Sequence, residues 1–310
     1  MYPFKTAISI AFLLVSFAQY GQHTDEINSN RPGETMSAFA VGKSVFQVES
    51  GIYGIHENHS LLNYDANGYG VDLTFRYGAL LEKLEFIADL QYQEQTVIDH
   101  SYQYNRSALK QTVLGAKYLF YDPFKGYKKE INVYSWKANR AFNWHQLIPA
   151  VSLFAGANLT FSDNPYYFSR EADISPKIML ITQNHFGDGR WVLVSNIIAD
   201  YIMTDYPSYG YVLTLTRGFN QKWSGFIENQ GYKSDFYSDA IVRGGAAYLV
   251  NRSLQIDVSI SNSLKTTPSI LYGGIGISWR YDANYKEVIM EGDKGDSKKA
   301  IRRAKKTKKG

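Results

Sequence analysis

The sequence contains no cysteine, and after its first two dozen residues it contains no long hydrophobic run. Without cysteine no disulfide can stabilise the fold, so stability has to come from hydrogen bonding and packing. No later segment reaches ~18 consecutive apolar residues, which excludes a helical membrane span. A transmembrane strand needs only about 9–11 residues, half of them facing away from lipid, so these absences leave a membrane barrel open.

Residues that carry catalysis or bind metals are also sparse. None of the histidines (His23, His56, His59, His100, His145 and His185) lies mid-strand beside a nucleophile, as a Ser–His hydrolase requires. His56 and His59 have a spacing that suits a metal, but ordinary loop polarity is the favoured interpretation. Gly70 and the pair Gly273-Gly274 lack the strand–turn–helix context of a nucleotide site. We therefore expect no enzyme activity, no catalytic residue, no metal and no cofactor.

The first residues have the layout of a secretory signal. Lys5 precedes an apolar run from Ala7 to Ala18, and small residues stand at Ala18 and Gly21. The run is shorter than the ~20 residues of a spanning helix. We expect a signal peptide over 1–21, cleaved near residue 18 or 21, with no lipid anchor because no cysteine follows. The alternative is an N-terminal core helix.

Strict alternation of apolar and polar residues is the dominant pattern. Between 253 and 261, every second side chain is apolar and shares one face of a strand, and the polar ones share the other face. Similar segments lie at 44–55, 67–78, 82–96, 108–121, 147–161, 174–185, 190–203, 209–218, 221–231, 238–249, 252–263 and 270–281. Their even number is typical of bacterial single-chain barrels. The sequence predicts an all-β fold, a transmembrane antiparallel up-and-down β-barrel of about 12 strands.

The connections alternate in length. Short turns lie at 79–81, 186–189, 218–221 and 250–251, and longer polar loops near 56–66, 97–107, 162–173, 204–208, 232–237 and 264–269. Short turns of such barrels face the periplasm, which places both termini there and the long loops outside. We expect a periplasmic N-terminal segment at 22–43, the barrel at 44–281, a periplasmic insert at 122–146 with a short helix near 135–140, and a disordered basic periplasmic tail at 282–310.

Charged residues fall on the polar faces of the strands. An Arg or Lys on the lipid face near the midplane costs roughly 2–4 kcal/mol, so we expect these residues in the lumen. The predicted lumen-lining set is Glu49, Asp72, Arg76, Glu85, Asp89, Lys117, Arg243, Asp257 and Arg280, with Lys177, Asp200 and Glu228 as weaker members. Together they are seven acids and five bases. Either they line a water-filled conduit and set its selectivity, or they form ion-paired networks that fill a narrow barrel.

The positive charge of the chain belongs to its tail. Residues 290–310 carry nine Lys or Arg and three acids, a net of +6, whereas the whole chain is +4. The remainder is about −2, so the barrel is not a general polyanion binder and nucleic acid is excluded as a partner. Lys298, Lys299, Arg302, Arg303, Lys305 and Lys306 are the predicted contacts to an acidic partner. The alternative is a solvated tail without a partner.

Several motifs resemble one family of outer-membrane barrels. Asn30-Arg31-Pro32-Gly33-Glu34-Thr35 precedes a first strand that contains Gln47-Val48-Glu49-Ser50-Gly51, and later pieces are Leu73–Gly78, Leu114–Tyr118 and Gly274–Tyr281. This arrangement resembles the family named for the MetA pathway of phenol degradation, also described as transporters. The family name implies uptake of hydrophobic aromatics, although no residue of this chain selects an aromatic substrate. The Gln-leading mature end resembles exported proteins of Bacteroidota, and 122–146 and the tail depart from the family pattern.

These observations predict a passive channel in the bacterial outer membrane, surrounded by lipid and conducting a small solute. The alternative is a non-conducting accessory subunit of a larger secretion or barrel-assembly complex. Such a subunit would engage periplasmic or outer-membrane protein partners through the insert and the tail. A soluble β-sandwich is a third interpretation.

Overall fold

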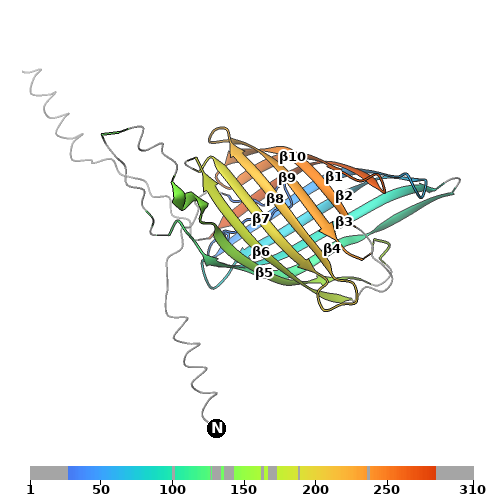
Figure 1. Ribbon diagram of the computed structural model, residues 1–310, viewed down its shortest axis with the longest axis horizontal. Coiled ribbons are helices and arrows are strands. Elements are labelled where there is room, and N and C mark those ends of the chain that lie inside the picture. Colours follow the sequence, from blue (N-terminus) through green and yellow to red (C-terminus); the bar gives the residue numbers. More distant parts are fainter. Residues whose placement is uncertain are drawn as a thin grey trace, which may run out of the picture.

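Twelve antiparallel strands form one closed barrel (Figure 1). The computed structural model describes residues 27–99, 102–125, 127, 134–135, 143–161, 164–166, 173–187, 189–235 and 238–283. The strands are β1 (Val45–His59), β2 (Tyr64–Gly78), β3 (Leu84–Asp99), β4 (Tyr102–Tyr121), β5 (Ala150–Leu159), β6 (Ile174–Phe186), β7 (Trp191–Asp200), β8 (Ser208–Gly218), β9 (Trp223–Lys233), β10 (Ser238–Asn251), β11 (Leu254–Ser263) and β12 (Ser269–Asp282). Consecutive strands pair, and β1 pairs with β12 to close the barrel.

The predicted fold class is confirmed, including the number of strands. The largest difference in bounds is at β4, which begins at Tyr102 instead of 108. Its additional residues pair with the end of β3, so that these two strands form a long hairpin that extends beyond β5. Figure 1 shows this hairpin at the right-hand end of the barrel.

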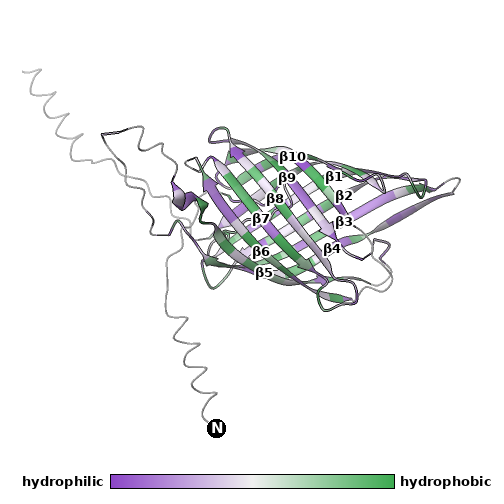
Figure 2. Cartoon of the chain, in the orientation of Figure 1, coloured by the Kyte–Doolittle hydropathy of each residue, from purple (hydrophilic) through white to green (hydrophobic). Residues whose placement is uncertain are grey.

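The two faces of the wall differ in polarity. On β11, Ile256, Val258 and Ile260 are 45%, 51% and 61% exposed, whereas Asp257 between them is 6% exposed. Apolar and polar residues alternate in the same way along other strands (Figure 2). A closed barrel has no free strand edge, and its exposed apolar wall is compatible with lipid. The chain is therefore an outer-membrane type of β-barrel, with its polar side chains inside.

Helical structure is limited in the described part of the chain. A single turn of 3-10 helix, η1 (Trp144–Leu147), precedes β5. No helix among the described residues is long and apolar enough to cross a membrane. Of the short helix expected near 135–140, residues 136–140 lie outside the described residues, as do the signal peptide at 1–21 and the tail beyond 283.

The N-terminal segment requires a correction. A periplasmic N-terminal segment is expected at 22–43, whereas residues 28–42 lie inside the barrel and bond to its inward side chains. The physical reason is that its unpaired main-chain groups find hydrogen-bond partners on the polar inner wall. The alternation pattern that identifies strands carries no information about a non-periodic segment.

The lipid-facing assignment predicts a large cost for a charge on the wall. Ile275 lies in the middle of β12, is 65% exposed, and has Ile52 and Val258 as register partners. We expect Ile275→Lys to destabilise the barrel by roughly 2–4 kcal/mol in lipid vesicles, because an ammonium group would enter the hydrocarbon layer. Urea unfolding followed by tryptophan fluorescence measures this change. Ile275→Val is the matched control, and equal stability of the two variants would contradict the assignment.

Candidate functional site

The centre of the lumen is crossed by residues 28–42, called the inner ring here because they follow the inner wall and contact every strand. The segment runs from Asn28, near β1 and β2, to the opposite wall at β7, and returns to the end of β2 after Gly42. The strand residues that bond to the ring are Glu49, Arg76, Glu85, Lys117, Ser152, Gln183, Asn196, Thr214, Glu228, Arg243, Gln255 and Ser278, one from each of β1 to β12.

These contacts satisfy the main chain of the ring. Asn196 accepts from the Met36 N–H at 2.7 Å and donates to the Met36 carbonyl at 2.9 Å. Glu85 accepts from the Val41 N–H at 2.8 Å, and Lys117 Nζ donates to the carbonyls of Ser37 and Phe39 at 2.6 and 3.1 Å. A buried main-chain group without a partner costs roughly 1–3 kcal/mol, so these side chains determine where the ring lies.

A fully buried charge network lies beneath the two ends of the ring, where Asn28 and residues 37–41 bond to β2, β3 and β4. Arg76 donates to Glu85 at 2.9 Å and to Glu49 at 3.0 Å, and Lys117 Nζ lies 3.2 Å from Glu85. Arg76 also donates to the Asn28 carbonyl at 2.7 Å. Two acids and two bases thus compensate one another in a region without solvent exposure. Removing one member would leave an uncompensated buried charge, which costs several kcal/mol.

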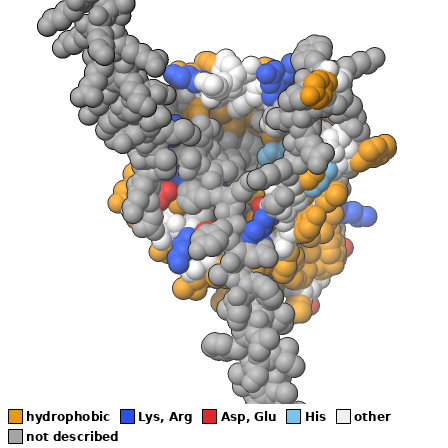
Figure 3. Space-filling model, turned by 90° about the vertical axis from the view of Figure 1, so that its left-hand side faces the viewer, with side chains coloured by type: hydrophobic (Ala, Val, Ile, Leu, Met, Phe, Trp, Pro, Cys, Tyr) orange, Lys and Arg blue, Asp and Glu red, His pale blue; other side chains and the backbone are white. Residues whose placement is uncertain are grey.

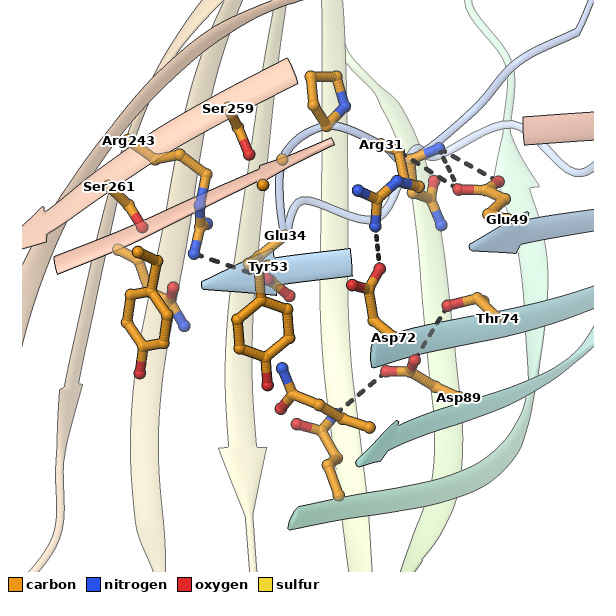
Figure 4. A pocket seen from close by; sticks show the side chains of 18 of the residues that line it. Arg31, Glu34, Glu49, Tyr53, Asp72, Thr74, Asp89, Arg243, Ser259 and Ser261 are labelled. Atoms are coloured by element: carbon orange, nitrogen blue, oxygen red, sulfur yellow. Dashed lines mark hydrogen bonds and ion pairs between the residues drawn. The ribbon is translucent and has the colours of Figure 1, made fainter. Parts of the chain in front are cut away.

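A cavity of about 380 Å³ lies in the lumen beside the ring. Arg31, Pro32, Gly33 and Glu34 of the ring form part of its wall. The strands contribute Glu49, Tyr53, Asp72, Thr74, Asp89, Gln91, Lys110, Gln111, Gln230, Tyr232, Arg243, Ser259, Ser261 and Tyr272, among others (Figure 4). Several of these stand further along their strands than the ring's partners do, towards the end where β1 turns into β2 and β3 into β4. The long loops expected near 56–66 and 97–107 are wrong, because most of these residues belong to the strands. Charges of both signs and three tyrosines therefore surround the cavity.

Individual contacts order the cavity wall. Asp89 accepts from the Thr74 hydroxyl at 2.9 Å and from Gln111 Nε2 at 3.1 Å. Lys110 Nζ lies 5.5 Å from the centre of the Tyr272 ring. Residues 31–34 of the inner ring are called its tip. Arg31 of this tip forms ion pairs with Asp72 and Asp257. The cavity thus presents carboxylates, an ammonium group and aromatic faces at fixed positions.

A second polar cluster lies near the barrel end where β1 turns into β2 and β3 turns into β4. Arg106 donates to Glu57 at 2.7 Å and to Gln95 at 2.9 Å, and it lies 5.2 Å from the ring centre of Tyr166. The Tyr166 hydroxyl donates to the carbonyls of Gln93 and Arg106 at 3.2 Å. Burial raises the pKa of Tyr166 to about 12, so its hydroxyl remains a donor at neutral pH. This loop residue thereby fastens the β5–β6 connection to the β3–β4 hairpin.

The structure places the nine predicted lumen residues on the inner face, in four groups. Arg76, Glu85 and Lys117 are enclosed beneath the ring, and Arg280 is buried near the barrel end, 3.7 Å from Asp282. Asp257 binds the ring through Arg31. The residues that reach the cavity wall are Glu49, Asp72, Asp89 and Arg243. The weaker candidates also point inward, with Lys177 paired to Asp200 at 3.0 Å and Glu228 bound to the ring.

Lys110 faces the lumen although it is absent from the predicted lumen-lining set. Pairing of β3 with β4 shifts between Gln91 and Tyr92, which leaves Lys110 as an extra residue and lets both Lys110 and Gln111 face the lumen. A β-bulge of this kind interrupts strict alternation and cannot be recognised from a period of two. The ring residues Arg31 and Glu34 were also missed. The excess of acids on the strands, seven against five bases, was the available signal that a cation reaches the lumen from elsewhere.

The two loop histidines and the end of the barrel contribute no further candidate site. His56 Nδ1 lies 2.7 Å from Asn67 Oδ1, and His59 Nδ1 accepts from the Leu62 N–H at 3.0 Å. Within the described ranges no group of three or more His, Asp or Glu side chains is arranged to hold a metal ion. Figure 3, which views the left-hand end of Figure 1, shows hydrophobic side chains along the outer flank and several charged ones towards the middle. The predicted tail contacts at 298–306 lie outside the described residues.

Comparison with known proteins identifies a family. The family model described as "Putative MetA-pathway of phenol degradation" matches residues 29–281. A search of curated proteins finds no match. Among solved structures, the chain is similar to an outer membrane channel from Pseudomonas putida F1, at 11% identity and a TM-score of 0.49, covering 83% of this chain and 100% of that one.

Two further structures are similar at the same low identity. The KdgM porin has 11% identity and a TM-score of 0.42, covering 74% of this chain and 98% of that one. The CymD monoaromatic hydrocarbon channel has 10% identity and a TM-score of 0.41, covering 78% and 90%. These matches concern the barrel architecture and carry no information about the solute of this chain.

The ring contacts predict local protection from hydrogen exchange. Asn196→Leu removes both partners of Met36 while keeping a side chain of similar size. We expect faster exchange in a peptide covering 34–38, by a factor of ten or more for a loss of about 1–3 kcal/mol. Hydrogen exchange with mass spectrometry provides the measurement. Asn158→Leu is the matched control, because Asn158 is inward but bonds to Ser175 and Asp200. Unchanged exchange in Asn196→Leu would contradict the described ring.

Proposed function

The chain belongs to the MetA-pathway family of phenol degradation, and on this premise we propose that it is an outer-membrane channel for a small polar solute. The observation that carries the proposal is the cavity of about 380 Å³ inside a barrel whose outer wall is apolar. Such a cavity holds a solute of modest size in a polar environment. Its wall carries charges of both signs, which in a narrow pore act on the charge and orientation of what passes.

The orientation of the channel follows from its connections. Four connections at the barrel end that carries the ring are short (79–83, 187–190, 219–222 and 252–253), whereas the β4–β5 connection at 122–149 is long. We assign this end to the periplasm, with both termini. The cavity lies on the side of the ring away from this end, and we assign that side to the cell exterior. A solute from outside thus reaches the cavity first and meets Arg31 to Glu34 as its floor. Asp72, Asp89 and Arg243 are the lining charges that meet it there.

Passage requires the ring to move. It bonds to all twelve strands, and a typical intramolecular hydrogen bond contributes about 0.5–1.5 kcal/mol. The resting channel is therefore closed or poorly conducting, and displacement of the tip of the ring opens a continuous path. The fully buried network of Arg76, Glu85 and Lys117 does not need to change, because the tip is held by other residues.

Planar-bilayer recording tests this proposal. A variant lacking residues 28–40 should conduct several-fold more than the intact chain, since the segment that crosses the lumen is removed. Lys117→Met, which loosens the ring without deleting it, should give an intermediate conductance. A folded barrel migrates differently before and after heating in a detergent gel, which verifies folding of each variant. Pure, folded proteins that never conduct, with or without the ring, would refute a channel.

A second candidate is a non-conducting accessory subunit of an outer-membrane secretion or barrel-assembly complex. The observation that favours it is the ring itself, because contacts with every strand describe a filled barrel as well as a closed channel. In addition, Tyr134 and Trp144 of the 122–146 insert are 97% and 76% exposed. Exposed aromatics at the periplasmic end suit a protein partner. The basic tail is the second proposed contact.

Affinity purification distinguishes the two candidates. The full chain and a 1–289 truncation are each tagged, extracted in mild detergent and compared with cross-linking. If the chain is an accessory subunit, the full chain should retain a stoichiometric partner that the truncation loses, with the loss growing at high salt because the tail contact is electrostatic. Identical, partner-free preparations would remove this candidate.

A further inference from the structure

The tip of the ring inserts one guanidinium group into a row of four residues on adjacent strands. Asp257 of β11 is the register partner of Gly276 on β12, Gly276 is the partner of Gly51 on β1, and Gly51 is the partner of Asp72 on β2. Arg31 lies across this row. We call Asp257, Gly276, Gly51 and Asp72 the guanidinium cradle. It spans the seam between the first and last strands.

The two glycines form a flat floor. A Cβ atom on Gly276 would lie 2.2 Å from Arg31 Nε, and one on Gly51 would lie 2.2 Å from Arg31 Nη2. At both positions the three nearest atoms all belong to the Arg31 guanidinium. Any other residue at these positions would therefore prevent a planar group from lying against the strands. The approach of the guanidinium therefore requires glycine at both positions.

The two acids form the sides of the cradle. Arg31 Nη2 lies 3.3 Å from Asp257 Oδ1 and Nε lies 3.4 Å from Oδ2, a two-pronged arrangement that matches a guanidinium to a carboxylate. Arg31 Nη1 donates to Asp72 from the other side. The Asp257 side chain has no solvent exposure, and that of Asp72 is 25% exposed. Two carboxylates facing one cation leave the cradle with a net negative charge.

The cradle opens onto the cavity. Arg31 and Asp72 both line it, and Figure 4 shows Arg31 projecting towards Asp72 at its edge. A small solute in the cavity therefore comes within reach of Asp72, one of the two carboxylates that hold Arg31. The other, Asp257, lies behind Arg31 and becomes accessible when the guanidinium moves away. The neighbouring Asp89 adds a third acid on this side of the cavity. The opposite charges, Lys110 and Arg243, extend from other strands.

We propose that the cradle is a recognition site for a small solute bearing a guanidinium group, and that Arg31 is its tethered occupant. A free guanidinium competes with Arg31 for Asp257 and Asp72. Its binding releases the tip of the ring, and this consequence for passage rests on the proposed channel function. An ammonium ion fits less well, because it lacks the planar fork that uses the glycine floor and the two-pronged contact to Asp257.

Binding of methylguanidinium to the full-length chain tests the proposal. Arg31→Ser empties the cradle, and isothermal titration in detergent micelles compares methylguanidinium with methylammonium, a cation of equal charge. We expect methylguanidinium to bind Arg31→Ser at least about tenfold more tightly than methylammonium, and at least about tenfold more tightly than it binds the unmodified chain. The first difference reports shape recognition, and the second reports competition by Arg31.

Two further variants supply the controls. In the Arg31→Ser background, Gly276→Ala should abolish the preference for methylguanidinium, because the added methyl group occupies the floor that Arg31 no longer uses. Arg31→Lys keeps a positive charge between the two acids and serves as a second variant if Arg31→Ser does not fold. The Arg31→Lys protein should also bind methylguanidinium more tightly than methylammonium. Equal binding of the two cations, or a preference unchanged by Gly276→Ala, would overturn the cradle as a recognition site.

The assay also separates this inference from the channel proposal. In planar bilayers, millimolar methylguanidinium should increase the conductance of the unmodified chain, and methylammonium should not. Selective binding without any conductance would refute the channel and leave the recognition site in place. Conductance without selective binding would refute the recognition site and leave the channel in place, since the ring would then open by another route.

Discussion

The requirement that a main chain inside a barrel must find hydrogen-bond partners governs this structure. The inner ring has no secondary structure of its own to satisfy its N–H and carbonyl groups. Side chains such as Asn196, Lys117 and Glu85 provide the partners, and they come from strands all around the barrel. The polar inner wall is thus a template that fits one path of the segment. The closed wall in turn keeps that path away from lipid.

From the sequence, we expect the inward charges either to line a conduit or to form ion-paired networks. The position of the ring explains why the charges on its two sides differ in this respect. Beneath the ring, Arg76, Glu85 and Lys117 of β2 to β4 form a compensated network without solvent, as the ion-paired interpretation expects. Beyond the ring, Asp89 and Lys110 face a cavity, the feature on which the proposed conduit rests. The ring separates the two regions. Its charged tip therefore has the position from which a closed lumen could respond to a solute.

The acids on the strands and Arg31, the cation of the ring, compensate one another. The inward acids outnumber the inward bases, and Arg31 supplies positive charge between Asp72 and Asp257. Glu34 provides the reverse contact, because its side chain lies 3.5 Å from Arg243. Removing one partner of such a buried pair is costly, because the other charge is left uncompensated. A cation that takes the place of Arg31 leaves neither Asp72 nor Asp257 uncompensated. Competition by a like-shaped cation is for this reason the natural way to release the ring.

The sequence by itself determined the barrel. Side chains alternate between two faces with a period of two, a local property, so the segment Leu254–Ile260 already revealed its lipid face, and repetition of the pattern fixed the strand number. The inward direction of Asp72, Arg76 and Asp257 followed from the same alternation.

Only the tertiary structure decided what occupies the lumen. Arg31 and Asp257 are 226 residues apart, and the row that joins Asp257, Gly276, Gly51 and Asp72 exists only because four strands adopt one particular register. Relative stagger leaves no trace in the alternation of any single strand. The bulge at Lys110 and the path of the ring are likewise products of pairing, since both depend on where partners lie rather than on the local sequence.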